Sequence, residues 1–133
     1  MASISNRVRL ATAADEVWDA LRDFGALHQR LVPGFVTDCR LDGDARVVTF
    51  ANGMTVRELL VDADETTRRL VYAIVDGPAT HYQGSAQVLS SGPRESELVW
   101  IIDLLPHEMA SQVAPMAAQG AAAMQKKFGT PAG

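Results

Sequence analysis

The sequence has few of the residues on which several classes of protein depend. Its 133 residues include one cysteine, Cys39, which excludes an internal disulfide and is typical of a reducing cytoplasm. The only two lysines, Lys126 and Lys127, do not make the basic patch that a membrane surface attracts, and a net charge of -4 argues against nucleic-acid binding. No apolar run approaches the roughly 20 residues of a membrane span, and the start lacks the apolar core of a signal peptide. We therefore expect a cytoplasmic protein that binds no nucleic acid and does not insert into a membrane.

Motifs that would identify an enzyme or a metal protein are also missing. The three histidines, His28, His81 and His107, lie in separate segments, and neither HxH, HExxH nor a cysteine pair occurs. There is no Gly-x-Ser-x-Gly elbow, phosphate-binding loop or dinucleotide fingerprint. Cys39 has no base beside it in the sequence and is interpreted as a buried spectator. The sequence predicts no metal and no cofactor, and it leaves open whether a reaction is catalysed.

The most regular pattern present is an amphipathic helix at residues 108–128. The apolar positions of one face fall at steps of three and four, at Met109, Val113, Met116, Gly120, Met124 and Phe128. A helix that only seals a core more often carries leucine and isoleucine, whose rotamers are better defined. The methionines and small residues therefore indicate either a wall that adapts to a bound molecule or a docking helix in which methionine fills gaps.

The region before this helix reads mainly as strands. Alternation predicts a first strand at residues 3–11 with its even positions inward. Thr12 is then expected to N-cap a helix, and a second short helix is expected at residues 26–31. Further strands are predicted at residues 35–41, 46–51, 54–63, 68–75, 81–89 and 95–105.

The turns between these strands are short, and two of them, at residues 42–44 and at Asn52-Gly53, are hairpin signals. A meander of hairpins followed by one long helix predicts an α+β fold, in which an antiparallel sheet curls around that helix. No repeat or linker divides the chain. We therefore expect one ligand-binding domain over residues 1–133.

Five segments, taken in order, carry a resemblance to a known family. They read ATAADEVWDALRDFGAL, NGMTVRELLVDAD, RRLVYAIVDGP, HYQGSAQV and LVWIIDLLP. Together they resemble the START-like or Bet v 1-like superfamily, and within it the bacterial polyketide cyclase/dehydrase and lipid transport family, over residues 3–128. Many relatives carry a tryptophan just before the proline that follows the second helix; here Val32 precedes Pro33, so we expect a lid of different shape or polarity.

The resemblance implies a helix-grip fold. In it a seven-stranded antiparallel curved sheet wraps around a long C-terminal helix, with two short helices between strands 1 and 2 and a cavity between sheet and helix. Because this fold hosts both enzymes and carriers, the resemblance does not fix the function.

Glu58 is the first candidate for chemistry. Alternation in VRELLV puts Glu58 and Leu60 on one face and Arg57 and Leu59 on the other, and the pattern does not decide which face is inward. In relatives with a known ligand the corresponding residue usually points into the cavity, and the resemblance implies the same for Glu58. A carboxylate there could act as a general acid or base, or could hold the polar end of a ligand. A solvated or cross-strand-paired glutamate is the alternative.

Other candidates lie on the presumed inner face of the sheet, on the helix or at the entrance. Tyr72 is the second catalytic candidate, and the small residues near Tyr82 leave room in a cavity wall. The predicted ligand-binding set is Glu58, Leu60, Tyr72, Ile74, Tyr82, Gly84, Ala86, Trp100, Met116 and Gly120. The predicted entrance residues are His28, Arg30 and His81, of which Arg30 could meet an anionic group of a ligand. Ordinary core or surface roles are the alternative for all of them.

Three functions fit these residues. The first is a binding module for a small hydrophobic ligand, such as a lipid, an isoprenoid or an aromatic polyketide. The second is a polyketide cyclase/dehydrase-type enzyme that uses Glu58 as acid or base and Tyr72 or Tyr82 to hold an enolate oxygen. The third is a chaperone-like protein whose methionine-rich helix contacts a partner. Since only Glu58 and two tyrosines are clear polar candidates, binding of a small apolar molecule is favoured, by a monomer or a homodimer.

Overall fold

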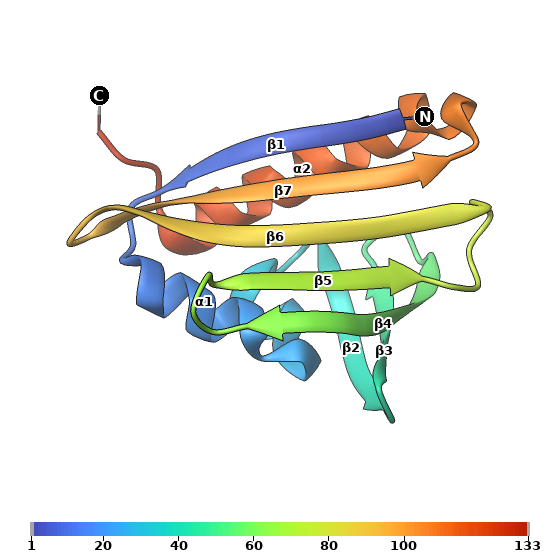
Figure 1. The fold of residues 1–133 in the computed structure, drawn as a ribbon, viewed down its shortest axis with the longest axis horizontal. Helices are drawn as coiled ribbons and strands as arrows, with labels where there is room; N and C mark the ends of the chain where they lie inside the picture. Colours follow the sequence, from blue (N-terminus) through green and yellow to red (C-terminus); the bar gives the residue numbers. More distant parts are fainter. Residues whose placement is uncertain (1, 133) are drawn as a thin grey trace.

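The strands form one antiparallel sheet whose hairpins follow the turn signals in the sequence. The computed structural model describes residues 2–132, and its sheet has the order β1-β7-β6-β5-β4-β3-β2 (Figure 1). The strands are β1 (Ala2–Leu10), β2 (Val36–Asp42), β3 (Ala45–Phe50), β4 (Thr55–Asp64), β5 (Arg69–Ile74), β6 (His81–Gly92) and β7 (Glu95–Leu105). The only neighbours that are not consecutive in sequence are β1 and β7, which pair antiparallel.

The helices occupy two places in the chain. Between β1 and β2 lie α1 (Ala14–Arg22), a 3₁₀ turn η1 (Phe24–Ala26) and a turn of π-helix η2 (Leu27–Leu31). After β7 come a 3₁₀ turn η3 (His107–Met109) and the long helix α2 (Ala110–Phe128). None of the helices in the described residues combines the length and the apolar content needed to cross a membrane.

The sheet curves around α2, as the helix-grip prediction requires. Figure 1 shows α2 running along β1 and β7, while β2 and β3 cross steeply to the direction of β6 and β7. The short helices lie at the opposite end of the molecule from the N-terminal end of α2 (Figure 1). The predicted α+β helix-grip, with seven antiparallel strands and short helices between the first two, is confirmed.

Alternation sets which side chains reach the core. In β1 the odd residues Ser3 to Arg9 are exposed, whereas Val8 and Leu10 are buried, as the pattern predicts. In β7 the residues Leu98, Ile102 and Leu104 are buried on the inner face. The core therefore fills the space between the inner face of the sheet and the helices.

The predicted N-cap of α1 is wrong. The helix begins at Ala14, and Ala13 occupies the cap position without a side-chain hydrogen bond. The Thr12 hydroxyl instead donates to the carbonyl oxygen of Phe128 at 2.7 Å. Thr12 is drawn away because β1 ends beside the end of α2, where Ala11 N donates to Gly129 O at 2.9 Å.

Candidate ligand-binding cavity

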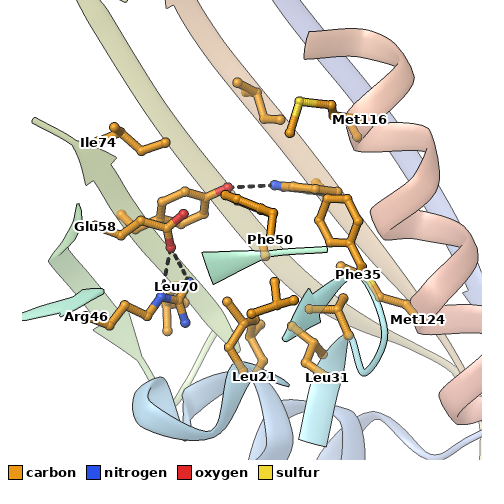
Figure 2. Close-up of a pocket in the computed structure, with 18 of the residues that line it drawn as sticks. Leu21, Leu31, Phe35, Arg46, Phe50, Glu58, Leu70, Ile74, Met116 and Met124 are labelled. Atoms are coloured by element: carbon orange, nitrogen blue, oxygen red, sulfur yellow. Dashed lines mark hydrogen bonds and ion pairs between the residues drawn. The ribbon is translucent and has the colours of Figure 1, made fainter. Parts of the chain in front are cut away.

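A cavity lies between the inner face of the sheet and α2 (Figure 2). Its volume is about 80 Å³, and most of its lining is apolar. The side chains that enclose it come from the short helices, the strands and α2, and include Leu21, Leu31, Phe35, Leu70, Ile74 and Met124. We call this space the inner chamber.

One buried ion pair interrupts the apolar wall of the inner chamber. Arg46 of β3 and Glu58 of β4 are direct cross-strand partners, and they are only 4% and 5% exposed. Glu58 Oε1 accepts a hydrogen bond from Arg46 Nε at 2.8 Å and is 2.7 Å from Arg46 Nη2, as the dashed lines in Figure 2 show. Burying one of these charges alone would be strongly unfavourable, so each side chain requires the other.

All three guanidinium nitrogens of Arg46 contact a protein acceptor, through three of the five N–H groups. Besides the two contacts with Glu58, Arg46 Nη1 donates to the Phe24 carbonyl oxygen at 3.2 Å. The guanidinium carbon lies 4.0 Å from the centre of the Phe24 ring and 5.6 Å from that of Tyr72, within range of cation–π attraction. Glu58 Oε2, by contrast, accepts no hydrogen bond from any residue between 2 and 132. Glu58 Oε2 is therefore an acceptor that the protein leaves available to a guest.

Two tyrosine hydroxyls belong to the same lining. Tyr72 is buried, and its hydroxyl oxygen accepts a hydrogen bond from Trp100 Nε1 at 3.1 Å, which leaves the hydroxyl proton free to donate. Burial, followed by the neighbouring Tyr82 and the charge of Glu58, raises the pKa of Tyr72 well above 10.0. Burial and then Glu58 also raise the pKa of Tyr82. Both tyrosines are thus neutral donors at physiological pH.

Most of the predicted binding residues meet at this cavity. The residues on its wall are Glu58, Tyr72, Ile74, Tyr82, Ala86, Trp100 and Met116. Alternation left the orientation of Glu58 open, and its side chain points inward, as the family resemblance implied. That these residues contact a ligand stays a prediction.

Leu60 does not line the cavity, so its predicted place is wrong. Its side chain is 39% exposed. Leu60 lies one residue beyond the paired part of β3 and β4, because Leu59 is the partner of Ala45, the first residue of β3. The register of β4 against β5 also shifts between Leu60 and Asp62. Leu60 is thus the last residue of β4 before that irregularity, and it lies beyond the part of the sheet that encloses the cavity.

Gly84 and Gly120, the two glycines predicted to line the cavity, pack against side chains of its wall and leave no open space beside them. A Cβ on Gly84 would lie 2.3 Å from Tyr72 Cζ, and one on Gly120 would lie 2.9 Å from Trp100 Cζ3. Neither glycine is among the lining residues. The prediction that Gly84 and Gly120 line the cavity is therefore wrong. These glycines instead let Tyr72 and Trp100 approach the backbone closely.

The predicted entrance residues are not at this cavity. Arg30 is held on the outer surface by Asp19 at 2.6 Å and Asp23 at 3.0 Å, so two carboxylates already satisfy its charge. His28 lies in η2, and its buried Nδ1 has no hydrogen-bond partner among the described residues. His81 is exposed at the start of β6. None of the three is among the lining residues of the cavity.

Sequence reasoning missed Arg46, although a signal was present. The strand ARVVTF alternates, and it places Arg46 on the same face as Val48 and Phe50. An arginine on an apolar face needs a buried anion, and Glu58 lies on the neighbouring strand of the same hairpin.

Other side chains complete the chemical description. Cys39 is buried and its Sγ donates to the Phe24 carbonyl oxygen at 3.6 Å; burial raises the pKa of this thiol, so it stays protonated, in keeping with a spectator role. Within residues 2–132 no three side chains of His, Cys, Asp or Glu are grouped so as to hold a metal ion.

A second pocket, which we call the outer chamber, adjoins the inner one. Its volume is about 120 Å³, and it lies between the β3–β4 turn, the loop after β5 and the start of α2. Its lining includes Met54, Pro78, Met109 and Gln112. Met54, Pro78 and Gln112 are exposed, so this chamber faces solvent.

Solved structures show the same fold in distant proteins. A crystal structure of an uncharacterised protein from Bacillus thuringiensis has a TM-score of 0.86 and 21% identity, covering 96% of this chain and 98% of that one. Norcoclaurine synthase from Thalictrum flavum, in complex with a transition-state analogue, has a TM-score of 0.70 and 22% identity, with coverages of 94% and 92%. A START superfamily protein from Mycobacterium smegmatis has a TM-score of 0.71 and 14% identity, with coverages of 93% and 97%. At these identities the likeness concerns the fold alone.

The sequence itself gives the family. No curated protein sequence matches the chain. The family described as polyketide cyclase / dehydrase and lipid transport, however, matches residues 1–129, nearly the whole length. The helix-grip fold, with its cavity between sheet and helix, agrees with that match. The chain belongs to the polyketide cyclase/dehydrase and lipid transport family.

Proposed function

We propose that the protein binds a small, mostly apolar molecule that carries a hydroxyl group, in the cavity between the sheet and α2. The observation that carries the proposal is the buried Arg46–Glu58 pair in an otherwise apolar wall. Binding sites for small molecules are typically apolar, with a few polar groups that fix orientation. The pair, with the two tyrosine hydroxyls, supplies that polar end.

The hydrogen-bonding groups that remain free in the site favour a ligand with a hydroxyl over one with a carboxylate. Each guanidinium nitrogen of Arg46 already contacts Glu58 or Phe24, whereas Glu58 Oε2 has no partner among residues 2–132 and is open to a donor of the guest. An alcohol or phenol can donate to this oxygen and accept from a tyrosine. A carboxylate would place a second negative charge beside Glu58 with no free cation to offset it. Among lipids, isoprenoids and aromatic polyketides, the site therefore favours those that carry a hydroxyl group.

The test compares three ligands of similar shape by isothermal titration calorimetry: 4-n-butylphenol, n-butylbenzene and 4-n-butylbenzoate. A hydrogen bond to a charged group contributes about 1.5–3 kcal/mol, so we expect the phenol to bind at least about tenfold more tightly than the hydrocarbon. We expect the benzoate to bind more weakly than the phenol. The variant Glu58→Gln should lose most of the preference for the phenol.

A matched control is available on the outer face of the sheet. Glu97 of β7 pairs there with Arg7 at 3.1 Å, so Glu97→Gln makes the same chemical change away from the cavity. It should leave all three affinities unchanged. Tighter binding of the benzoate than of the phenol, or a preference for the phenol that survives in Glu58→Gln, would contradict the proposal.

An enzyme of the cyclase/dehydrase type is the second candidate. Its support is that Glu58, Tyr72 and Tyr82 line one cavity, where a carboxylate could accept a proton while a phenol stabilises an enolate oxygen. Incubation with a polyketide chain, followed by mass spectrometry of the products, distinguishes the two. Return of the chain unaltered counts against the enzyme, and loss of water from the chain counts for it.

The chaperone-like alternative loses its basis. It required the methionine face of the terminal helix to be offered to a partner. Met116 and Met124 instead line the inner chamber, and Met109 lines the outer chamber. The methionines of this face therefore line the two chambers, which favours ligand binding over partner binding.

A further inference from the structure

The inner and outer chambers meet at four shared side chains. Phe50, Ile74, Tyr82 and Met116 line both chambers. They come from β3, β5, β6 and α2, so they surround the junction from the sheet and from the helix. In Figure 2, Ile74 and Met116 lie at one end of the inner chamber, and Leu21 and Leu31 lie at the other.

The sizes of the chambers indicate that a guest with a ring uses both. The inner chamber has about 80 Å³ and the outer about 120 Å³. An apolar cavity of about 150 Å³ binds benzene. Each chamber is smaller than that, whereas the two together exceed it. A ring whose hydroxyl lies at Glu58 would therefore reach from the inner chamber toward the junction and extend its substituent into the outer chamber.

Met116 is the most adaptable member of the junction. Its unbranched side chain has three rotatable bonds, whereas Phe50 and Tyr82 are rigid rings and Ile74 is β-branched. Of the other methionines near the cavity, Met54 and Met109 line only the outer chamber, and Met124 lines only the inner one. Met116 alone among them can change the width of the passage.

We infer that Phe50, Ile74, Tyr82 and Met116 form a constriction that selects ligands by the thickness of the group next to the anchored ring, and that Met116 sets this width. The inference rests on the proposed function, because it takes the hydroxyl of the guest to lie at Glu58. A linear chain passes between the four side chains into the outer chamber. A branched group of the same atomic composition is stopped at the constriction.

The experiment compares two isomers, 4-n-butylphenol and 4-tert-butylphenol, by titration calorimetry on the full chain. Their composition and hydroxyl group are the same, so the ratio of their affinities reports mainly shape. We expect the parent protein to bind the linear isomer about tenfold more tightly. In Met116→Ala, which widens the passage, the ratio should fall to about twofold or less through tighter binding of the branched isomer.

Two variants delete the same side chain elsewhere along the cavity. Met109→Ala changes only the outer chamber and Met124→Ala only the inner one. Both should keep the parent's ratio, whatever they do to overall affinity. If Met116→Ala does not fold, as judged by its thermal transition, Ile74→Ala widens the junction from the sheet and should lower the ratio in the same way.

The outcomes separate this inference from the proposed function. Equal affinity of the two isomers for the parent, or a ratio that changes as much in Met109→Ala as in Met116→Ala, overturns the constriction. If Glu58→Gln still weakens the phenols in that case, the proposed binding function stands. If neither phenol binds the parent at all, both proposals fail.

Discussion

Arg46 and Glu58 determine the chemistry of the cavity through a single contact. Their strands are joined by a hairpin, and the two residues are direct cross-strand partners, so the register of that hairpin places them side by side. The charges are nearly inaccessible to water, and each is stabilised mainly by the other. Such a pair makes little net contribution to stability when compared with apolar residues of the same volume. Its presence inside an apolar wall therefore supports a role in binding.

The first prediction separates the structural role of the pair from its binding role. Arg46→Met or Glu58→Leu alone leaves one buried charge unpaired and should lower the free energy of unfolding by about 3–5 kcal/mol. The double variant should recover most of that loss while losing its preference for phenols. Urea denaturation of the four proteins measures the coupling. A double variant as unstable as the sum of the two single variants would show that the two side chains are not coupled, which would contradict the prediction.

The second prediction concerns the two tyrosines, which are the only ones in the chain. Burial raises the pKa of both above 10.0, so the folded protein should show no phenolate absorbance near pH 10, whereas the chain in urea titrates there. A raised pKa in the folded state gives stability that is complete below the unfolded value. That stability should decline as the pH rises above 10 toward the folded values. A spectrophotometric titration of the folded protein with one phenolate forming near pH 10 would mean that one tyrosine is exposed.

For single residues, the sequence predicts which side chains belong to the cavity region better than it predicts where each of them lies. The inward orientation of Glu58 came from the family resemblance, and Trp100 was predicted on the inner face from alternation. The prediction for Leu60 is wrong because this residue lies just past the pairing of Leu59 with the first residue of β3 and is partly exposed there. Gly84 was interpreted as empty space, yet the ring of Tyr72, from the neighbouring strand, fills it. A contact across strands of this kind depends on a rotamer that the pattern does not contain.

Among the elements, α1 is tied to the sheet by one side chain of the turn after β4. Glu65 accepts a hydrogen bond from Trp18 Nε1 at 2.6 Å and another from Arg22 Nη1 at 2.8 Å. These contacts, with Trp18 first, lower the pKa of Glu65 below its ordinary 4.5. Because α1 carries Leu21, which lines the inner chamber, this tie also positions one end of the cavity.

The third prediction tests that tie by pH. A lowered pKa in the folded state gives stability that is complete above pH 4.5 and is lost as the pH falls through the folded value. We expect Glu65→Gln to have a lower Tm than the parent near neutral pH, with the difference shrinking as the pH falls below 4.5. The same change at the exposed Glu108 should leave Tm unaltered at all pH values. A difference for Glu65→Gln that is constant from neutral to acidic pH would argue against a charge effect.

Most element boundaries could be predicted because turn chemistry fixes them. The hairpins at residues 42–44 and at Asn52-Gly53 lie where their residue types indicated, and β7 begins and ends at the predicted residues. The start of α1 could not be predicted, because Thr12 bonds to a residue 116 positions away. Long-range contacts of this kind override local capping preference.

For the whole molecule, the order of elements was enough to predict the fold, but not the shape of its interior. A first strand, six hairpin-linked strands and a final helix have few ways to bury their apolar faces, and the helix-grip is one of them. The division of the cavity into two chambers depends on how Phe50, Ile74, Tyr82 and Met116 meet from four elements. The placement of Arg30 on the outer surface likewise depends on two acids of the α1 region. The division of the cavity and the place of Arg30 both depend on how side chains pack in three dimensions, which the sequence pattern does not specify.

The most direct test of the account uses the two tryptophans as reporters in a proton–nitrogen NMR titration. The indole N–H of Trp100 donates to Tyr72 on the cavity wall, whereas that of Trp18 donates to Glu65 outside the cavity lining. On addition of 4-n-butylphenol, the account predicts a saturable shift of the Trp100 indole signal and an unchanged Trp18 signal. A Trp100 signal that stays in place up to the solubility limit of the phenol, or that moves no more than the Trp18 signal, would contradict the claim that this cavity is the binding site.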